Sequence, residues 1–244
     1  NGRPVGVMHL CDLKRLKGVE FPLYGEQGGL FLSPRFSSAA AKYLDSKGLA
    51  LKSFLSSLLL AGLLGYLTVL AGMYIFQRRL LYFPDRAASP VPSGMQEVWL
   101  KSEDGVRLNA WFAKPADGAA TVLYLHGNAG NLGTTAPRLQ AYLDAGLGVL
   151  GIDWRGYGKS EGEPSEEGLY ADGRAGLAFL KEQGIPLGRV FLHGESLGSG
   201  IATQLATEES VAGLILEAPY LSVAEAAQYH YPYLPARWLV RDRF

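Results

Sequence analysis

Hydrophobic residues are distributed unevenly along the chain, and the longest apolar stretch carries no charge. No charged residue lies between Lys52 and Arg78, and the 23 positions 54–76 are mainly Leu, Ala, Gly, Tyr and Phe. At ~1.5 Å per residue, a helix of this length spans roughly 35 Å and can cross the ~30 Å hydrocarbon core of a bilayer. A buried core helix rarely stays uncharged for so long, and a cleaved signal peptide has a shorter apolar run nearer the N-terminus. The pattern therefore predicts a transmembrane helix over 54–76 and a single-pass protein with an N-terminal membrane anchor.

The segments that flank this helix are less informative. Three lysines within residues 42–52 precede it and three arginines within residues 78–86 follow it, so the positive-inside rule does not assign the side of the membrane on which the remainder lies. Residues 1–53 show no pattern that indicates a function. The only element predicted there is a short helix over 37–47. Residues 77–95, rich in Pro, Ser and Ala after position 84, predict a linker that leaves the membrane.

Beyond residue 95, short apolar runs alternate with helical patterns. Two predicted strands, 96–102 and 106–113, flank an Asp104-Gly105 turn that is typical of a β-hairpin. Further strands are predicted at 121–125, 148–152, 189–192 and 211–216, and helices at 135–145, 166–183 and 197–206. Strands that alternate with helices form a mostly parallel sheet with helices on both faces. The predicted fold class is therefore α/β, with a core over 96–219 and a separate segment over 220–244.

Composition and charge exclude several functions. Lys and Arg total 23, as do Asp and Glu, so the chain lacks the basic excess with which proteins bind nucleic acid. Cys11 is the single cysteine, which excludes an intrachain disulfide and a thiolate metal cluster. The four histidines are scattered and have no nearby carboxylates that would complete a recognisable metal site. We expect no metal, no cofactor and no nucleic-acid partner.

The strongest chemical signal is a Gly-x-Ser-x-Gly motif at residues 194–198, directly between a predicted strand and a predicted helix. At such a junction Gly194 and Gly198 permit a tight, strained turn that raises the Ser196 hydroxyl above the edge of the sheet. The backbone N–H groups at the start of the helix are then available to a developing oxyanion. The alternative is that Ser196 only caps the helix, but a cap does not need both glycines. We therefore predict that Ser196 is a nucleophile and that the N–H of Leu197 is one oxyanion donor.

A second glycine-rich turn follows the earlier buried strand. Residues 126–131 are His-Gly-Asn-Ala-Gly-Asn, and such a turn can direct a backbone N–H into the same cleft. We assign the second oxyanion donor to the N–H of Asn128. The alternative is that Asn128 is an ordinary turn residue that tolerates left-handed geometry.

Taken together, these segments resemble the α/β-hydrolase superfamily. The resemblance rests on the hairpin, the turn at 126–131, Asp-Trp-Arg-Gly-Tyr-Gly-Lys-Ser at 153–160, the motif at 194–198 and Glu-Ala-Pro-Tyr at 217–220, in this order. With the apolar helix and Arg-Leu-Leu-Tyr-Phe-Pro at 79–84, the chain is similar over 78–244 to the membrane-anchored branch described as Bem-like or serine-aminopeptidase-like. The resemblance implies a serine hydrolase with a Ser, Asp, His triad that cleaves an ester, thioester or amide.

The chain departs from this family in one respect. In the fold, the acid and then the histidine follow the serine, but no strand pattern appears after the predicted strand 211–216, and 220–244 resembles the start of a cap or lid. His230 precedes Asp242, which reverses the expected order, and His126 and His193 fit structural roles in glycine turns. We therefore expect the triad acid and histidine to be absent from this chain, its C-terminal part to be missing, and the isolated chain to be inactive and poorly folded, with an exposed apolar sheet edge.

The membrane anchor and the aromatic-rich segment 220–244 favour an acyl-containing small molecule, a lipid or an acylated protein as the substrate. A non-catalytic, membrane-anchored binding protein on a hydrolase scaffold is the alternative. Residues 158–160, Gly-Lys-Ser, end like a phosphate-binding P-loop, but Asp153 stands where that motif needs glycine. Asp153 and Arg155 are instead expected to form a structural pair beside the site. The acidic residues within 161–167 are interpreted as a solvated loop, with Ser165 as a helix cap.

Overall fold

A computed structural model of the chain describes residues 34–244. Cys11 and most of the N-terminal segment 1–53 lie outside the described residues. The chain divides into two compact units, Asn1–Thr68 and Val69–Phe244. The first unit contributes only helix to the described residues, and the second contains the sheet and the remaining helices.

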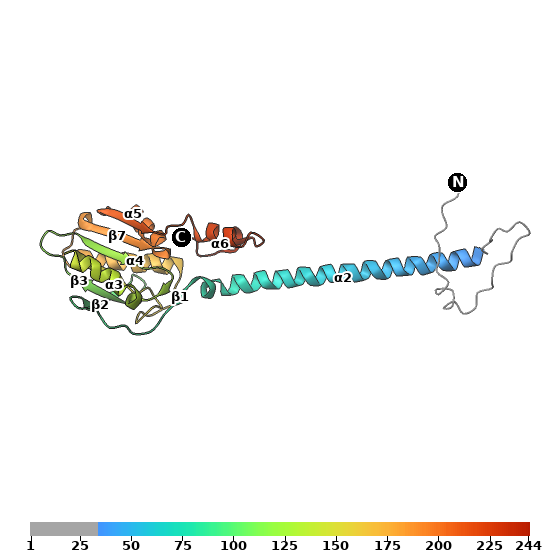
Figure 1. The fold of residues 1–244 in the computed structure, drawn as a ribbon, viewed down its shortest axis with the longest axis horizontal. Coiled ribbons are helices and arrows are strands. Elements are labelled where there is room, and N and C mark those ends of the chain that lie inside the picture. Colours follow the sequence, from blue (N-terminus) through green and yellow to red (C-terminus); the bar gives the residue numbers. More distant parts are fainter. Residues whose placement is uncertain (1–33) are drawn as a thin grey trace, which may run out of the picture. The chain divides into compact units, whose positions relative to one another are not determined.

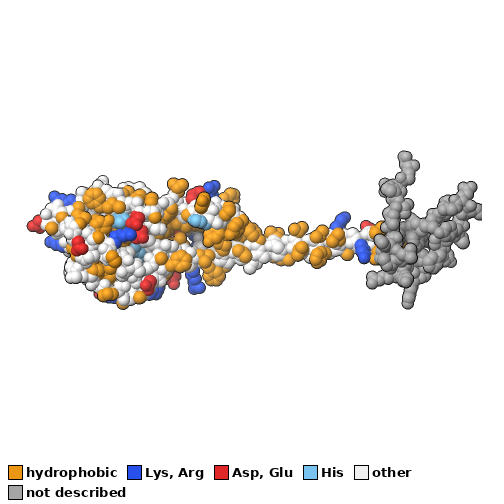
Figure 2. All heavy atoms as spheres, viewed as in Figure 1, with side chains coloured by type: hydrophobic (Ala, Val, Ile, Leu, Met, Phe, Trp, Pro, Cys, Tyr) orange, Lys and Arg blue, Asp and Glu red, His pale blue; other side chains and the backbone are white. Residues whose placement is uncertain are grey.

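The predicted apolar helix is present and longer than expected. Helix α2 runs over Pro34–Leu81 and contains both the predicted span 54–76 and the short helix predicted over 37–47. Every side chain from residue 41 to residue 69 is exposed, and Figure 2 shows apolar side chains along the visible surface of this helix, with charged side chains toward its N-terminal end. From Ala41 onward α2 is long and apolar enough to cross a membrane. An exposed apolar surface of this kind is not that of a core helix.

Six strands form the central sheet of the second unit, in the order β2-β3-β6-β4-β7-β8 (Figure 1). The β2–β3 and β3–β6 pairs are antiparallel, and β6, β4, β7 and β8 are parallel to one another. All six strands lie within a few residues of their predicted positions. Their bounds are Gln96–Lys101 (β2), Arg107–Ala113 (β3), Thr121–Leu125 (β4), Gly148–Ile152 (β6), Val190–Glu195 (β7) and Gly213–Glu217 (β8). The mostly parallel α/β fold is thus confirmed.

Helices cover both faces of this sheet. Alternate residues of β4 point to opposite faces, as in any strand: Leu123 and Leu125 join the core cluster that contains α4 and α5, whereas Tyr124 joins the cluster that contains α3. The helices are α3 (Leu132–Asp144), α4 (Glu166–Glu182), α5 (Leu197–Glu208), α6 (Val223–His230) and α7 (Ala236–Leu239). Ser165 caps α4 as predicted, and α3 begins earlier than predicted because Asn131 and Thr134 form a capping box.

Two features near the ends of the second unit differ from expectation. Residues 77–81 of the predicted linker are the last turn of α2, and Phe83–Pro84 (β1) pairs with Ala129–Gly130 (β5). The predicted lid segment 220–244 contains the short helices α6 and α7. At the sheet edge, Leu214, Ile215 and Leu216 of β8 are 39–40% exposed, and no strand among the described residues pairs with the outer side of β8. This exposure agrees with the predicted apolar edge, whereas poor folding of the isolated chain stays a prediction.

Candidate active site

The turn between β7 and α5 holds Ser196 in a strained conformation. Its φ is 49° and its ψ is −114°, in a region that residues with a side chain rarely adopt. Its side chain makes no capping hydrogen bond to α5, and its backbone N–H donates to Glu217 O at the end of β8 (2.8 Å). Ser196 is therefore not an ordinary helix cap, because the turn is strained and the hydroxyl has no structural partner among the described residues.

Close backbone approaches explain the two glycines of the motif. A Cβ at Gly194 would lie 2.3 Å from the carbonyl oxygen of Gly198, and a Cβ at Gly198 would lie 1.9 Å from that of Leu125. Both distances are too short for any side chain, so the first turn of α5 can pack against the ends of β7 and β4 only with glycine at both positions. This packing brings the loop after β4 to the serine, since a Cβ at Gly127 would lie 3.6 Å from Ser196 Cβ.

The loop after β4 is held on several sides. Asn128 Nδ2 donates to Leu81 O (2.9 Å) at the end of α2, and Asn128 O accepts from Phe83 N and from the Tyr157 hydroxyl, each at 2.9 Å. Trp154 Nε1 donates to His126 O (3.0 Å). Within residues 34–244 neither the N–H of Asn128 nor that of Leu197 forms a hydrogen bond, and their role as oxyanion donors stays a prediction.

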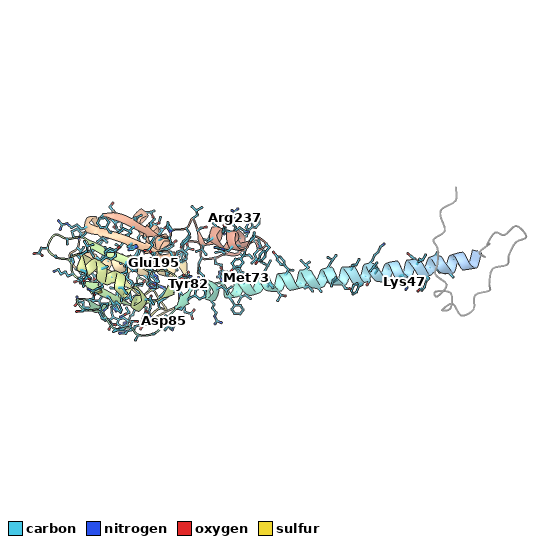
Figure 3. The ribbon with its side chains drawn as sticks, viewed as in Figure 1. Lys47, Met73, Tyr82, Asp85, Glu195 and Arg237 are labelled. Atoms are coloured by element: carbon cyan, nitrogen blue, oxygen red, sulfur yellow. The ribbon has the colours of Figure 1, made fainter. Side chains whose placement is uncertain are left out.

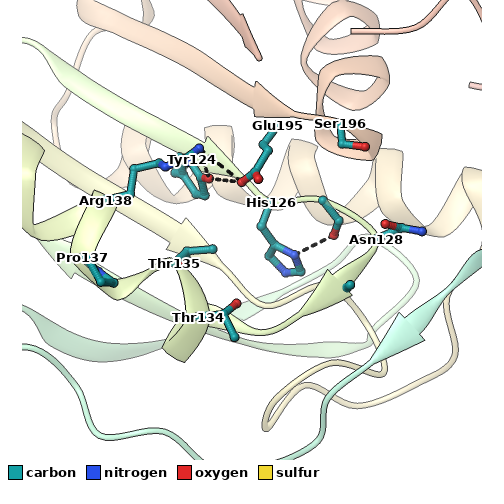
Figure 4. A pocket seen from close by; sticks show the side chains of 11 residues that line it. Tyr124, His126, Asn128, Thr134, Thr135, Pro137, Arg138, Glu195 and Ser196 are labelled. Atoms are coloured by element: carbon teal, nitrogen blue, oxygen red, sulfur yellow. Dashed lines mark hydrogen bonds and ion pairs between the residues drawn. The ribbon is translucent and has the colours of Figure 1, made fainter. Parts of the chain in front are cut away.

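A cavity of about 580 Å³ lies beside this turn, and both Ser196 and Asn128 line it (Figure 4). Three further lining residues, Tyr124, Arg138 and Glu195, were not predicted from the sequence. Arg138 Nη1 lies 3.3 Å from Glu195 Oε2 and donates to the Tyr124 hydroxyl (3.1 Å). It also pairs closely with Glu217, and the Tyr124 hydroxyl donates to Glu195. Burial, together with the hydrogen bond to Glu195, raises the pKa of Tyr124.

None of the three candidate histidines forms a hydrogen bond with Ser196 Oγ. His126 Nδ1 lies 2.8 Å from Gly127 O, and complete burial lowers the pKa of His126 to about 4. His193 Nδ1 bonds to the Tyr142 hydroxyl (2.8 Å), and burial also lowers the pKa of His193. His230 is exposed at the end of α6. Each buried histidine thus forms a hydrogen bond through Nδ1, whereas its Nε2 is buried with no hydrogen-bond partner among the described residues.

The last acidic candidate, Asp242, has other partners. Its carboxylate accepts hydrogen bonds from Arg78 Nε (3.2 Å) and from the Tyr82 hydroxyl (2.9 Å), both next to the end of α2. Asp242 is buried, so this pairing ties the C-terminal segment to the end of α2. The described residues therefore place Ser196 and Asn128 in the lining of one cavity, and no histidine among them is hydrogen-bonded to the serine.

The expected pair between Asp153 and Arg155 is wrong, although both residues organise the loop. Asp153 Oδ1 accepts from Leu132 N (2.7 Å) at the start of α3, and burial raises the pKa of Asp153 to about 7. Arg155 Nη2 instead binds Asp172 (2.8 Å) and its Nη1 binds Asp104 (2.6 Å). Sequence proximity suggested a pair, but the two side chains point to different elements. Within residues 34–244 no group of three His, Cys, Asp or Glu side chains is placed to hold a metal ion.

Known proteins share this architecture. The model of the serine aminopeptidase family S33 matches residues 116–241, just over half of the chain. An uncharacterised protein of Mycobacterium tuberculosis is 40% identical over 189 residues, which are 72% of this chain and 66% of that protein. An uncharacterised membrane protein of Saccharomyces cerevisiae is 32% identical over 196 residues, 73% of this chain and 68% of that protein. The chain thus spans just under two thirds of the mycobacterial relative's length.

A solved structure agrees with these relatives. The crystal structure of an α/β-hydrolase from Vibrio vulnificus aligns with 57% of this chain and 50% of its own, with a TM-score of 0.50 and 32% identity. The order of the six strands and the strained serine turn between β7 and α5 define the second unit as an α/β-hydrolase domain. Within that class, the chain belongs to the serine aminopeptidase S33 family.

Proposed function

We propose that the protein is a membrane-anchored serine hydrolase in which Ser196 is the nucleophile. The observation that carries this proposal is the turn at Ser196: a strained serine with an unpartnered hydroxyl, whose two neighbouring glycines are required by backbone contacts of 2.3 Å and 1.9 Å to an added Cβ. Strain of this kind costs free energy, and it clusters at sites where it serves function.

The reaction follows from the groups around the cavity. Ser196 Oγ attacks the acyl carbon of an ester, thioester or amide while a general base takes its proton, and the negative charge that forms on the acyl oxygen accepts hydrogen bonds from the N–H groups of Leu197 and Asn128. The leaving alcohol, thiol or amine departs with that proton. Water then attacks the acyl-enzyme and loses a proton to the base, which returns a proton to Ser196 Oγ as the bond between that oxygen and the acyl carbon breaks and the acid is released.

The general base of this mechanism is not among the described histidines. We propose that the full-length protein supplies both the histidine and its acid partner from outside these 244 residues, and that the 244-residue chain alone has little activity because an unassisted serine hydroxyl is a weak nucleophile. The chain spans 66% of the mycobacterial relative, which supports this proposal.

Membrane attachment through residues 54–76 completes the proposal. It is supported by the exposed apolar surface of α2 and by the description of the yeast relative as a membrane protein. A membrane-attached hydrolase meets acyl groups at the bilayer surface, so we propose a lipid, an acylated protein or another acyl-containing molecule as the substrate.

A fluorophosphonate probe, which forms a covalent adduct with activated serines, tests the nucleophile. In the protein at its full native length we expect the adduct on Ser196, as mapped by mass spectrometry. Ser196→Ala should abolish the adduct and the hydrolysis of short acyl esters, whereas the exposed Ser210→Ala should change neither. An unlabelled Ser196 in the folded full-length protein, or hydrolysis that survives Ser196→Ala, would refute the proposal and favour the non-catalytic binding protein.

A further inference from the structure

A second cavity, separate from the one at Ser196, lies between the last turns of α2 and the C-terminal helices α6 and α7. Its volume is about 470 Å³, within the ~300–1,000 Å³ range of ligand sites. Met73, Leu80 and Phe83 form one wall, and Leu234, Leu239 and Val240 face them. Figure 3 places Met73 in the last turns of α2 and Arg237 in the C-terminal segment.

The cavity offers no unpaired charge to a ligand. Asp242, its only carboxylate, is neutralised by Arg78 and accepts the Tyr82 hydroxyl. The amide of Gln77 is also occupied, because Nε2 donates to Tyr74 O (2.8 Å) and Oε1 accepts from Arg241 N (2.7 Å). A space of this size with mainly apolar walls and paired polar groups favours a hydrocarbon chain over a polar ligand.

The position of the cavity indicates where such a chain would come from. Met73 and Tyr74 belong to the uncharged run 54–76, and Gln77-Arg78-Arg79 follow it. A ~30 Å hydrocarbon layer centred on that run ends close to these residues. Met73, Tyr74 and Gln77, which line the cavity, are then level with the boundary between acyl chains and headgroups.

Two arginines at this boundary lack acidic partners. The Arg241 guanidinium lies over the ring of Tyr74, 5.4 Å from its centre, and that of Arg79 lies 5.8 Å from the centre of the Phe76 ring. Both side chains are exposed, and neither pairs with a carboxylate in the part of the chain that the structure describes. Arginine is well suited to bind a phosphate group.

We propose that this cavity binds one acyl chain of an anionic membrane phospholipid, with the lipid phosphate against Arg79 and Arg241. The inference rests on the membrane placement of α2 proposed above and does not require reaction at Ser196. The site would hold a lipid beside the domain and fix the angle at which the end of α2 meets the bilayer.

Photocrosslinking of the full-length protein in lipid nanodiscs tests the site. The probe is phosphatidylglycerol with a diazirine on one acyl chain, compared with phosphatidylcholine that carries the same chain. We expect adducts on Met73, Leu234 or Leu239, and stronger labelling by phosphatidylglycerol. Arg79→Gln and Arg241→Gln should each lower the preference for phosphatidylglycerol by about fivefold, the effect of ~1 kcal/mol per basic residue. Arg189→Gln, an exposed arginine elsewhere, should leave it unchanged.

The second part of the experiment fills the cavity with a larger side chain. Ala227→Phe on α6 should abolish the adducts on cavity residues, whereas Ala226→Phe, its neighbour outside the lining, should preserve them. Met73→Trp fills the cavity from the α2 side and repeats the test if the α6 variant does not fold. Labelling confined to residues 54–72, or cavity adducts that survive both filling variants, would overturn the lipid site and leave the membrane anchor intact. An absence of labelling anywhere on α2 would overturn both the lipid site and the membrane anchor. None of these results bears on the fluorophosphonate adduct at Ser196.

Discussion

The two carboxylates that bind Arg155 are expected to contribute very differently to stability. Asp172 is fully buried and accepts three hydrogen bonds from Arg155, from its backbone N (2.9 Å), Nε (3.0 Å) and Nη2 (2.8 Å). The Asp104 side chain is 45% exposed, although it accepts from the same guanidinium at 2.6 Å and 3.2 Å. Replacing each carboxylate by Asn in turn compares the stability that a buried and a partly exposed partner of the same arginine contribute.

The burial difference sets the expected magnitudes. Removing one partner of a buried pair costs about 3–5 kcal/mol, and after Asp172→Asn the buried Arg155 side chain, only 7% exposed, keeps only the half-exposed Asp104 as a charged partner. An exposed pair contributes about 0–1 kcal/mol, because water screens it. In a domain of about 150–250 residues each kcal/mol lowers Tm by about 2–4 °C. Asp172→Asn should therefore lower Tm by about 6–20 °C, and Asp104→Asn by less than about 4 °C.

Intrinsic tryptophan fluorescence of the full-length protein measures both shifts, since Trp111 and Trp154 are buried in the second unit. The double variant Arg155→Met/Asp172→Leu removes both buried charges and should recover much of the loss, because apolar replacement of a buried pair is often neutral. Equal Tm shifts for the two Asn variants would refute the argument from burial. A double variant with a Tm as low as that of Asp172→Asn would also refute the argument, because it would show that lost packing, and not the lost charge partner of Arg155, lowers the stability.

Four further predictions concern the site and its supports. Gly198→Ala, whose Cβ would lie 1.9 Å from Leu125 O, should abolish the fluorophosphonate adduct on Ser196, whereas Gly188→Ala, which meets no atom within 4 Å, should retain it. Asn128→Ala removes the hydrogen bond to Leu81 O but keeps the proposed N–H donor, so it should slow acylation of Ser196 in rapid-quench assays and leave Tm within a few degrees; an unchanged rate would contradict its positioning role. Because burial raises the folded-state pKa of Asp153 to about 7 from a usual 3.8, its stabilising contribution is fully present below about pH 4 and is lost as the pH rises to about 7; the Tm of Asp153→Asn relative to wild type should therefore rise from pH 5 to pH 8, and a constant difference would refute this. Thermal unfolding of the isolated, detergent-solubilised 244-residue chain should be broad, because β8 exposes Leu214, Ile215 and Leu216; a cooperative transition would contradict this expectation.

The sequence predicts the sheet well because each strand is a short apolar run with clear boundaries. The bounds of β4 and β6 match the predicted 121–125 and 148–152, since a strand buried on both faces leaves a continuous apolar signature. The turn at Ser196 was predictable for a related reason, because its two glycines and its strand-to-helix position are local. The length of helix α2 was underestimated because the prediction followed the apolar run, which begins at position 54, whereas the helix itself also includes the polar residues before that position.

Features built from distant residues could not be predicted. The β1–β5 pair contains two residues in each strand, too few for any pattern. The cluster in the Ser196 cavity joins Arg138 to Glu217, which is 79 positions away. Arg155 likewise selects Asp104 and Asp172, at separations of 51 and 17, over its sequence neighbour Asp153. The pairing of each arginine with a carboxylate depends on how strands and helices are arranged in space, and this arrangement cannot be read from a short stretch of sequence.

The anchor helix and the proposed oxyanion site share one hydrogen-bonded junction. The last residue of α2, Leu81, accepts from the Asn128 side chain, and Phe83 N donates to Asn128 O. Arg78 near the end of α2 and Tyr82 directly after it donate hydrogen bonds to Asp242 of the C-terminal segment. Both sets of contacts lie within residues 78–83, so we expect a change in this last turn of α2 to act on the Asn128 loop and on the C-terminal segment together. Because Asn128 and Ser196 line the same cavity, we expect a substitution that breaks the bonds at this junction to change the geometry at Ser196.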